Sequence, residues 1–270
     1  MSPHLDDAVL SCGLLLALPS RRGEGACVVT VFTEGQGHDR RREEDREAMA
    51  ILGVDHVHLG LEDAPERRSL ARTHAALVEE AELEARDVES VQHAVEGALV
   101  AIGRPSVLYV PLGVGRHVDH RTVHAALRDR REAAFYEDRP YALVPGATRA
   151  RLIEAGLVLA EPEPELAEAP APGEVERAYD ALPHLQRFLG DDLAVRAASL
   201  RALAAHHAAP PSAPPGLPSR RVVVRRTSTT PESASRAALA ARAYASQGAL
   251  LPPSLPRAER TYHPVDGLVR

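Results

Sequence analysis

Lysine and tryptophan are absent from the 270 residues, and aromatic residues make up only 3% of the chain. All 32 basic residues are arginines, which excludes a Schiff-base lysine or a serine–lysine catalytic pair. With so few aromatic rings, we expect no stacking platform for single-stranded nucleic acid. The net charge of −6 provides no overall field that would attract DNA, RNA or an anionic membrane. The sequence therefore predicts no nucleic-acid partner.

Cysteines and long apolar runs are also scarce. The two cysteines, Cys12 and Cys27, form no CxxC pair and lie in apolar stretches, which predicts reduced core residues and a cytoplasmic protein. No apolar run is long enough to span a membrane. The first apolar stretch, 9–18, follows aspartates and not the basic segment of a signal peptide. Nothing in the sequence defines the oligomeric state.

Apolar stretches typical of buried strands alternate with amphipathic stretches typical of helices through residue 140. The patterns predict strands over 27–33, 55–61, 105–113 and 133–138, and helices over 7–18, 40–53, 77–103 and 119–130. A turn at 19–23 follows the first helix, and Gly53 ends the second. This alternation indicates an α/β fold with a mostly parallel sheet covered on both faces. Sites in such sheets lie at the carboxyl ends of the strands.

The second half of the chain has a different composition. Two proline-rich segments, 161–174 and 209–218, are expected to be loops, with a helix over 178–207, a strand over 220–226 and a helix over 231–247. The four arginines that flank the strand predict a charge-protected edge strand, and an anionic partner stays open. We expect a metal-binding core over 1–145, and a part over 146–270 that completes the same domain.

The first residues, MSPHLDDAVLSCG, place a histidine and two aspartates before an apolar stretch. Capping of the following helix is the simpler interpretation, but it accounts for only one of the two carboxylates. His4 and Asp7 are three residues apart, which on the first turn of a helix brings imidazole and carboxylate to one point. Both groups are ordinary zinc ligands. Asp6 would point elsewhere and be free to act as a general base.

A second stretch, GRHVDHRTVHAAL, contains His117, His120 and His124 with Asp119 among them. A polar helix start is the simpler interpretation, but three histidines and an aspartate directly after a strand favour a site. One of these histidines would complete a three-ligand metal centre with the first motif. A water molecule in the fourth position would make that centre catalytic.

Other histidines are weaker candidates. His120 and His124 have the spacing of a zincin motif, but Arg121 stands where that motif needs glutamate. We therefore expect His124 to lie behind a ligand or at the surface. His206 and His207 precede a proline-rich loop and are predicted to be solvated.

The pair SPHLDDAVLSCG and RHVDH resembles the PIG-L or LmbE-like deacetylases, zinc enzymes that remove acetyl groups from N-acetylglucosamine-type sugars. The motifs of that family are usually AHPDD or SHPDD, and HPDH or HxDH. Weaker similarities lie at 41–45, 52–53, 61–67, 135–142 and 243–247, so the resemblance extends over most of the chain. It implies a Rossmann-like three-layer sandwich whose sheet is mostly parallel and whose first strand is truncated here.

The resemblance also implies the metal centre and its base. His4, Asp7 and His120 match the three ligands of one zinc ion, and Asp6 matches the general base. The zinc would lower the pKa of its bound water and polarise the acetyl carbonyl, and Asp6 would take the proton.

Four further residues receive roles from the resemblance. His117 matches the histidine that stabilises the oxyanion and protonates the leaving amine. Asp119 matches its neighbouring carboxylate, which is expected to favour the imidazolium form of His117. Arg41 and Asp63 align loosely with positions that contact the sugar.

Three departures from the family pattern stand out. Leu5 replaces the common proline of the first motif. Gly115 occupies a position where some members carry a tyrosine, so that role is empty or is filled from elsewhere. Only Met1, Ser2 and Pro3 precede His4, which is too short for an ordinary strand. We expect that the natural chain begins upstream or that the structure compensates for the missing strand.

The expected function is metal-assisted hydrolysis of an N-acetyl group on a small-molecule sugar or glycoside, in the tailoring of an antibiotic or a thiol sugar. One alternative retains the metal but cleaves another small-molecule amide. Phosphoester hydrolysis is less favoured, because a second metal would need more carboxylates than the two motifs supply. Another alternative is a non-catalytic sugar-binding relative. Zinc content and acetate release would separate these functions.

Overall fold

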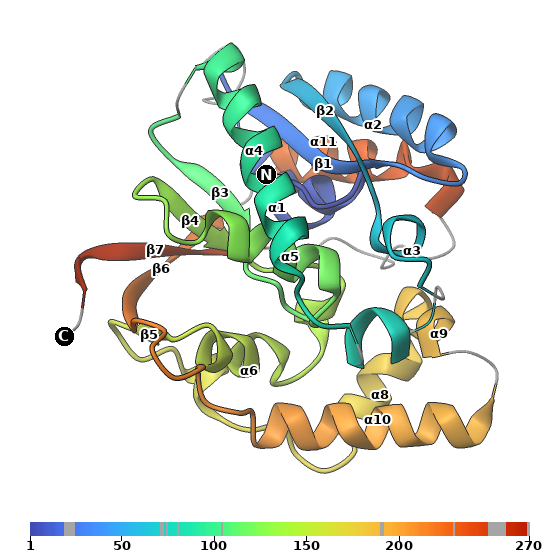
Figure 1. Ribbon diagram of the computed structural model, residues 1–270, viewed down its shortest axis with the longest axis vertical. Helices are drawn as coiled ribbons and strands as arrows, with labels where there is room; N and C mark the ends of the chain where they lie inside the picture. Colours follow the sequence, from blue (N-terminus) through green and yellow to red (C-terminus); the bar gives the residue numbers. More distant parts are fainter. Residues whose placement is uncertain are drawn as a thin grey trace.

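The computed structural model describes residues 1–18, 25–70, 73, 75–79, 81–103, 105–189, 192–228, 230–247 and 258–268, which form a mixed α/β fold with two sheets (Figure 1). The smaller sheet pairs β1 (Cys27–Glu34) with β2 (Asp55–Glu62) in parallel. The larger sheet has the order β3 (Leu108–Pro111), β4 (Ala133–Tyr136), β7 (Ala258–Leu268), β6 (Arg220–Ser228) and β5 (Leu157–Leu159). In this sheet β7 is antiparallel to both neighbours, whereas β3 and β4, and β5 and β6, are parallel pairs.

The described helices gather in separate groups around these sheets. The α-helices are α1 (Asp7–Leu16), α2 (His38–Leu52), α3 (Ala64–Arg67), α4 (Ala85–Ile102), α5 (Val118–Leu127), α6 (Ala147–Glu154), α7 (Pro164–Ala167), α8 (Glu174–Ala181), α9 (Pro183–Leu189), α10 (Leu193–Ala208) and α11 (Pro231–Arg242), with short helical turns at Ala75–Glu79, Tyr141–Leu143 and Ala245–Gln247. α11 packs on α1 and α2, and α4 packs on α5. None of the described helices is long and apolar enough to cross a membrane.

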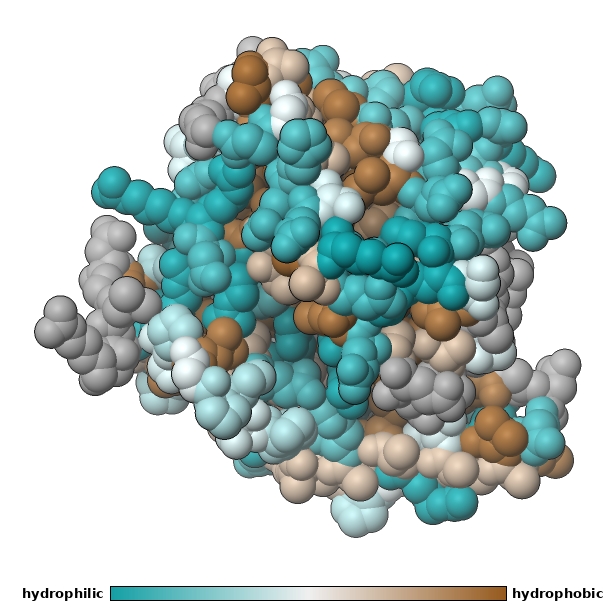
Figure 2. Space-filling model, in the orientation of Figure 1, coloured by the Kyte–Doolittle hydropathy of each residue, from teal (hydrophilic) through white to brown (hydrophobic). Residues whose placement is uncertain are grey.

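Two apolar clusters hold these groups together. The larger joins strands β3, β4 and β6 to α4, α5 and the helices of the second half, and the smaller lies between α1, α2 and α11. Figure 2 shows a largely hydrophilic face, with apolar side chains over α10 along the lower edge. The metal-ligand candidates lie at the starts of α1 and α5, so both ends of the site rest on packed helices.

The predicted alternation of strands and helices is present in the first half, and parallel pairing is present in β1–β2, β3–β4 and β5–β6, but the strands form two sheets and the larger one is mixed. β7 runs antiparallel between β4 and β6. Its sequence, AERTYHPVDGL, lacks a continuous apolar run, so periodicity did not predict it. The predicted edge strand at 220–226 is also wrong, because β6 pairs with β5 and β7.

Helix boundaries differ from the prediction mainly at prolines and caps. The helix predicted over 178–207 is divided among α8, α9 and α10, because Pro183 begins α9 and Asp192 caps α10 through the N–H groups of Ala194 and Val195. The helix predicted over 77–103 begins only at Ala85. Gly53 ends α2 with a left-handed backbone, as predicted, and the predicted turn at 19–23 lies outside the described residues.

Residues 1–3 connect the two sheets by backbone hydrogen bonds. Ser2 N donates to Val29 O (2.8 Å) and Val31 N donates to Ser2 O (2.9 Å), so Ser2 pairs with β1 as a short parallel bridge. On the other side, Met1 N donates to Tyr109 O of β3 (2.6 Å). These bonds fix the chain directly before His4.

A buried carboxylate on β7 supports the interior of α1. The helix has non-helical backbone angles at Cys12, and Glu259 accepts hydrogen bonds from Leu14 N (2.7 Å) and Leu15 N (2.9 Å). Burial raises the pKa of Glu259 from 4.5 to about 7, even though these N–H donors favour the charged form. The charged carboxylate is therefore costly at this position.

We predict that Glu259 makes the protein lose stability as the pH rises from about 4.5 to about 7. In this window the folded protein binds a proton at Glu259 that the unfolded chain has released, so raising the pH favours unfolding. Melting temperatures measured between pH 5 and pH 8 should fall less steeply for Glu259→Gln than for the parent. Glu232→Gln, at an exposed glutamate on α11, is the matched control. Parallel curves for the parent and Glu259→Gln would contradict the prediction.

Candidate metal centre

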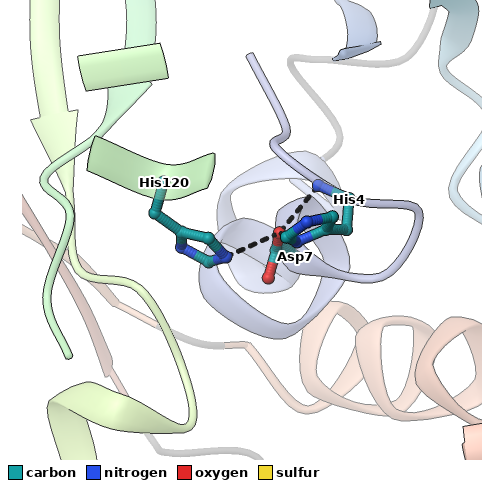
Figure 3. Close-up of side chains that lie close together, drawn as sticks. All are labelled: His4, Asp7 and His120. Atoms are coloured by element: carbon teal, nitrogen blue, oxygen red, sulfur yellow. Dashed lines mark hydrogen bonds and ion pairs between the residues drawn. The ribbon is translucent and has the colours of Figure 1, made fainter. Parts of the chain in front are cut away.

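The side chains of His4, Asp7 and His120 converge between the starts of α1 and α5 (Figure 3). Asp7 Oδ2 lies 3.1 Å from His4 Nδ1 and 3.2 Å from His120 Nε2. Asp7 Oδ2 also accepts a hydrogen bond from the backbone N–H of His4 (2.8 Å), which fixes the turn between the two residues. The sequence spacing and the fold thus bring all three predicted ligands together.

The donor set fits a zinc ion. Two imidazole nitrogens and one carboxylate oxygen lie within 4.8 Å of one another and are mostly buried. With bonds of about 2.0–2.2 Å to a tetrahedral zinc, neighbouring ligand atoms are about 3.4 Å apart. The separations of 3.1 and 3.2 Å are close to this value. His4, Asp7 and His120 would hold the ion without a rearrangement of the backbone.

Each imidazole is held from behind by a second carboxylate. His4 Nε2 lies 3.1 Å from Asp119 Oδ2, and His120 Nδ1 lies 2.7 Å from Asp138 Oδ1. The other oxygen of Asp138 accepts hydrogen bonds from the backbone N–H groups of Gly113 and Val114. Carboxylates on the outer nitrogen of a ligand histidine fix the tautomer and the direction of the ring. This arrangement supports metal binding more strongly than the three ligands alone.

The electrostatics of the centre follow from its buried carboxylates. Burial would lower the pKa of His4, but hydrogen bonds to Asp119 and Asp7 outweigh it and raise that pKa to about 9. Burial also disfavours the charged form of Asp7, but His120 and His4 lower the pKa of this carboxyl well below its usual value. The site therefore attracts positive charge, which a divalent metal would supply.

A second group of possible ligands, His4, His117 and Asp119, shares one histidine with the first. Asp119 already accepts hydrogen bonds from Arg67 Nη2 (2.9 Å) and from the backbone N–H of Ala64 (2.9 Å). These two donors hold the Asp119 carboxylate in a position where it orients the His4 ring. The geometry therefore favours His4, Asp7 and His120 as the metal group.

The surroundings of His117 act on its charge in opposite directions. Burial, followed by the nearby His4, lowers the pKa of His117 well below its ordinary value, and the opposing effect of Asp119 is smaller. His117 Nδ1 accepts a hydrogen bond from Asp119 N (3.3 Å), so the neutral ring carries its proton on Nε2. Asp119 raises the pKa of His117, as expected, but burial and His4 oppose it.

Asp6 begins α1 but does not cap it. It occupies the N-cap position without a side-chain capping bond, and its Oδ1 lies 3.3 Å from Arg41 Nη2 on α2. The structure thus brings together Asp6, the expected general base, and Arg41, an expected sugar contact. Capping, the simpler interpretation, is not what Asp6 does.

Asp63, the other expected sugar contact, lies beside a histidine that the sequence analysis did not select. His38 Nε2, at the start of α2, is 3.9 Å from Asp63 Oδ2, and both side chains are almost fully buried. Asp63 and His38 follow β2 and β1, at the carboxyl-end edge of the parallel pair. In the absence of a ligand, neither side chain is presented openly to solvent.

The comparisons with known proteins agree with these motifs. A model of the GlcNAc-PI de-N-acetylase family, PIG-L, matches residues 1–130, which contain every proposed ligand. Residues 1–130 are therefore similar to the PIG-L family.

One curated relative and several solved structures extend the likeness. A 2'-N-acetylparomamine deacetylase from Streptomyces fradiae is 35% identical over 163 residues, covering 53% of this chain and 56% of the relative. The aligned part thus spans about half the length of that relative. The A40926 pseudoaglycone deacetylase has the same overall fold, with a TM-score of 0.56, 21% identity, and coverage of 100% of this chain and 97% of that chain. A teicoplanin-pathway deacetylase has a TM-score of 0.57 at 19% identity, with coverage of 98% and 97%.

Tyr141 fills the space at the glycine that departs from the PIG-L pattern. Gly115 has a left-handed backbone (φ 81°), and a Cβ built there would lie 2.2 Å from the Tyr141 ring. The same ring makes an edge contact with His120, with centroids 5.7 Å apart. An aromatic ring therefore reaches this position from the segment after β4.

Several contacts of the PIG-L site were not predicted from the sequence. Asp138, which contacts His120, lies in the motif FYEDRPYA. Arg67, which pairs with Asp119, lies in another of the weakly similar segments. The sequence alone assigned neither residue a role in the site. His124 is buried and not at the surface, since its Nδ1 bonds to Pro111 O (2.9 Å). The prediction of solvated residues is wrong for His207, which is buried and contacts Pro145 O.

We predict that Asp138→Asn weakens zinc binding about 10–100-fold, because an amide cannot accept hydrogen bonds from all three of its present donors. Competition with a chromophoric chelator would measure the affinity. Asp55→Asn, at an exposed residue that begins β2, should bind zinc as the parent does. Equal affinities for Asp138→Asn and the parent would show that Asp138 does not support the ligand.

We predict that Gly115→Ala destabilises the fold by roughly 1–3 kcal/mol more than Gly60→Ala. Both glycines have a left-handed backbone, so both substitutions carry a similar conformational cost of about 1–2 kcal/mol. Only the alanine at 115 meets the Tyr141 ring, since nothing lies within 4 Å of a Cβ at Gly60. Urea unfolding would measure the difference, and equal losses would contradict the assigned packing of Tyr141.

Proposed function

We propose that the protein is a zinc-dependent N-deacetylase that removes an acetyl or related acyl group from an N-acetylglucosamine-type sugar or glycoside. The observation that carries this proposal is the group His4, Asp7 and His120, with a carboxylate behind each imidazole. Such a three-ligand set leaves a coordination position for water or substrate and is typical of catalytic zinc.

The relatives support the reaction and the substrate class. The curated relative is named for deacetylation of 2'-N-acetylparomamine, an acetylated amino sugar conjugate. The structural relatives are named as deacetylases of A40926 pseudoaglycone and of teicoplanin biosynthesis, and one was solved with teicoplanin. We infer that this protein acts on an acetylated sugar of a small-molecule glycoside, in antibiotic tailoring.

We also propose the finer architecture that the motifs imply. Residues 1–145 and 146–270 would form one domain with a Rossmann-like three-layer arrangement. The parallel pairs β1–β2 and β3–β4, joined through residues 1–3, support this arrangement. Two helix groups, α1–α2–α11 and α4–α5, support it further.

The reaction would divide among the metal with its three ligands and five further side chains. Zinc bound by His4, Asp7 and His120 would supply Lewis-acid activation of the water and of the amide carbonyl. Asp6 would accept the proton from the attacking water as the new C–O bond forms, and would return it to the nitrogen as the C–N bond breaks. Arg41, which contacts Asp6, would hold the carboxylate in this position and face the sugar.

His117 would act as a neutral donor. Because its Nδ1 accepts the N–H of Asp119, its proton lies on Nε2, which would donate to the developing oxyanion. Asp119 would orient His4 instead of charging His117, since its Oδ2 lies beside His4 Nε2. Asp63 would contact a sugar hydroxyl from the edge formed by the loops after β1 and β2.

We predict that Asp6→Asn retains zinc but loses roughly 10²–10⁴ in kcat, because only the base is removed. Elemental analysis and acetate release measured on the same preparation would test this. Loss of zinc in Asp6→Asn would mean that the roles of Asp6 and Asp7 are exchanged.

His117→Ala should lower kcat far more than it raises KM, because the hydrogen bond to the oxyanion forms in the transition state. Steady-state kinetics on one N-acetylated sugar would separate the two parameters. A rise in KM at unchanged kcat would make His117 a substrate-binding residue only.

The function itself is tested by acetate release from a panel of N-acetylglucosaminides that includes 2'-N-acetylparomamine, with N-acetylated amino acids as control amides. We expect release from the sugars, its loss with a chelator and its return with zinc. Release only from the control amides would identify a different amidase. Tight sugar binding without release, at full zinc content, would identify a sugar-binding relative.

A further inference from the structure

A cavity of about 440 Å³ lies between α5, α6 and the proline-rich segment 209–218, outside the metal centre. Its lining residues are Leu83, Arg116, Arg121, His124, Ala125, Arg128, Arg151, Glu154, Ala155, Pro211, Ser212, Pro214 and Leu217. His4, Asp7, His117, Asp119 and His120 are not among them. The proposed deacetylation uses none of these lining residues.

The lining brings four guanidinium groups together with one carboxylate. Glu154 lies 3.6 Å from Arg116 Nε and 3.5 Å from Arg151 Nη1, and it also contacts His206 Nε2 at 3.2 Å. Arg121 donates only to a backbone carbonyl, Ala81 O, among the contacts of the described residues. Asp129 lies 3.6 Å from Arg128 Nε, and Glu82 is a further opposite charge near Arg121. Four guanidinium groups thus face three carboxylates, so the positive charge is incompletely balanced.

His124 lies at the same cavity and has one ring nitrogen to spare. Its side chain is 2% exposed, and its Nδ1 must donate a proton because the partner, Pro111 O, only accepts. Its buried Nε2 has no hydrogen-bond partner among the described residues. Burial and Arg151 lower the pKa of His124 well below its ordinary value, so the ring is neutral. Nε2 then accepts a hydrogen bond, although arginines surround it.

A ligand that satisfies this lining must accept hydrogen bonds from guanidinium groups and donate one to His124 Nε2. Sulfate has the charge but no hydrogen to donate, whereas a protonated phosphoryl group has both. We propose that the cavity binds a protonated phosphoryl group, as inorganic hydrogen phosphate or as a phosphate monoester. The apolar side chains of Leu83, Pro211 and Leu217 line the remaining space and fit the organic part of a monoester.

Calorimetric titrations near pH 5, where inorganic phosphate and most of the phenyl phosphate retain a proton because the second pKa of a phosphate monoester is about 6, test the proposal with inorganic phosphate, phenyl phosphate and sulfate. Wild-type protein should bind phosphate at least fivefold more tightly than sulfate. Arg121→Gln should weaken phosphate binding roughly tenfold or more, as expected for a lost charged hydrogen bond. Arg225→Gln removes the same charge from an exposed position on β6 and should change the affinity less than twofold.

Two further variants complete the test. His124→Gln, or His124→Phe if the first variant does not fold, should reduce the preference for phosphate over sulfate. His120→Ala should retain phosphate binding, since the metal centre is not the proposed site. Tighter binding of phenyl phosphate than of phosphate would identify a monoester as the ligand, and the reverse would identify free phosphate.

Four results would overturn the proposal: no phosphate binding, equal binding of sulfate, unchanged affinity in Arg121→Gln, or loss of binding in His120→Ala. The last would place the anion at the metal. None of these results depends on deacetylase activity, so failure of this proposal leaves the proposed function to its own test.

Discussion

The carboxylate of Asp7 lies buried between the imidazoles of His4 and His120, and this contact joins the two ends of the candidate site. A charged carboxylate in such a position is stable only if cations or hydrogen-bond donors surround it. His4 contributes both its ring and its backbone N–H, and His120 contributes its ring from α5. The start of α1 and the start of α5 must therefore keep their relative position for the site to exist.

Several parts of the fold fix the relative position of these two helix starts. Backbone bonds of residues 1–3 tie the segment before His4 to β1 and β3. Asp138, directly after β4, holds His120 from behind and also bonds to the loop after β3. Asp119 connects His4 to Arg67, whose guanidinium stacks 4.7 Å above the Phe32 ring of β1. The positions of the ligands thus depend on contacts with β1, β3 and β4 and not on one loop.

The sequence predicted the ligands better than their supports. The spacing of His4 and Asp7 is a local property of a helix start, so it could be interpreted without the fold. The contact between His120 and Asp138 depends on how the end of β4 meets α5, which no local pattern contains. For the same reason the analysis paired Asp119 with His117, its neighbour in sequence, although the carboxylate also reaches His4. β7 was missed because a mixed polar sequence can form a strand once β4 and β6 flank it.

The central claim is that one metal ion binds between His4, Asp7 and His120, and zinc-edge anomalous diffraction tests it most directly. Crystals prepared with one equivalent of zinc should give a single anomalous peak within about 2.0–2.2 Å of His4 Nδ1, Asp7 Oδ2 and His120 Nε2. A peak coordinated instead by His4 Nε2, His117 and Asp119, or no peak at either group, would contradict the account.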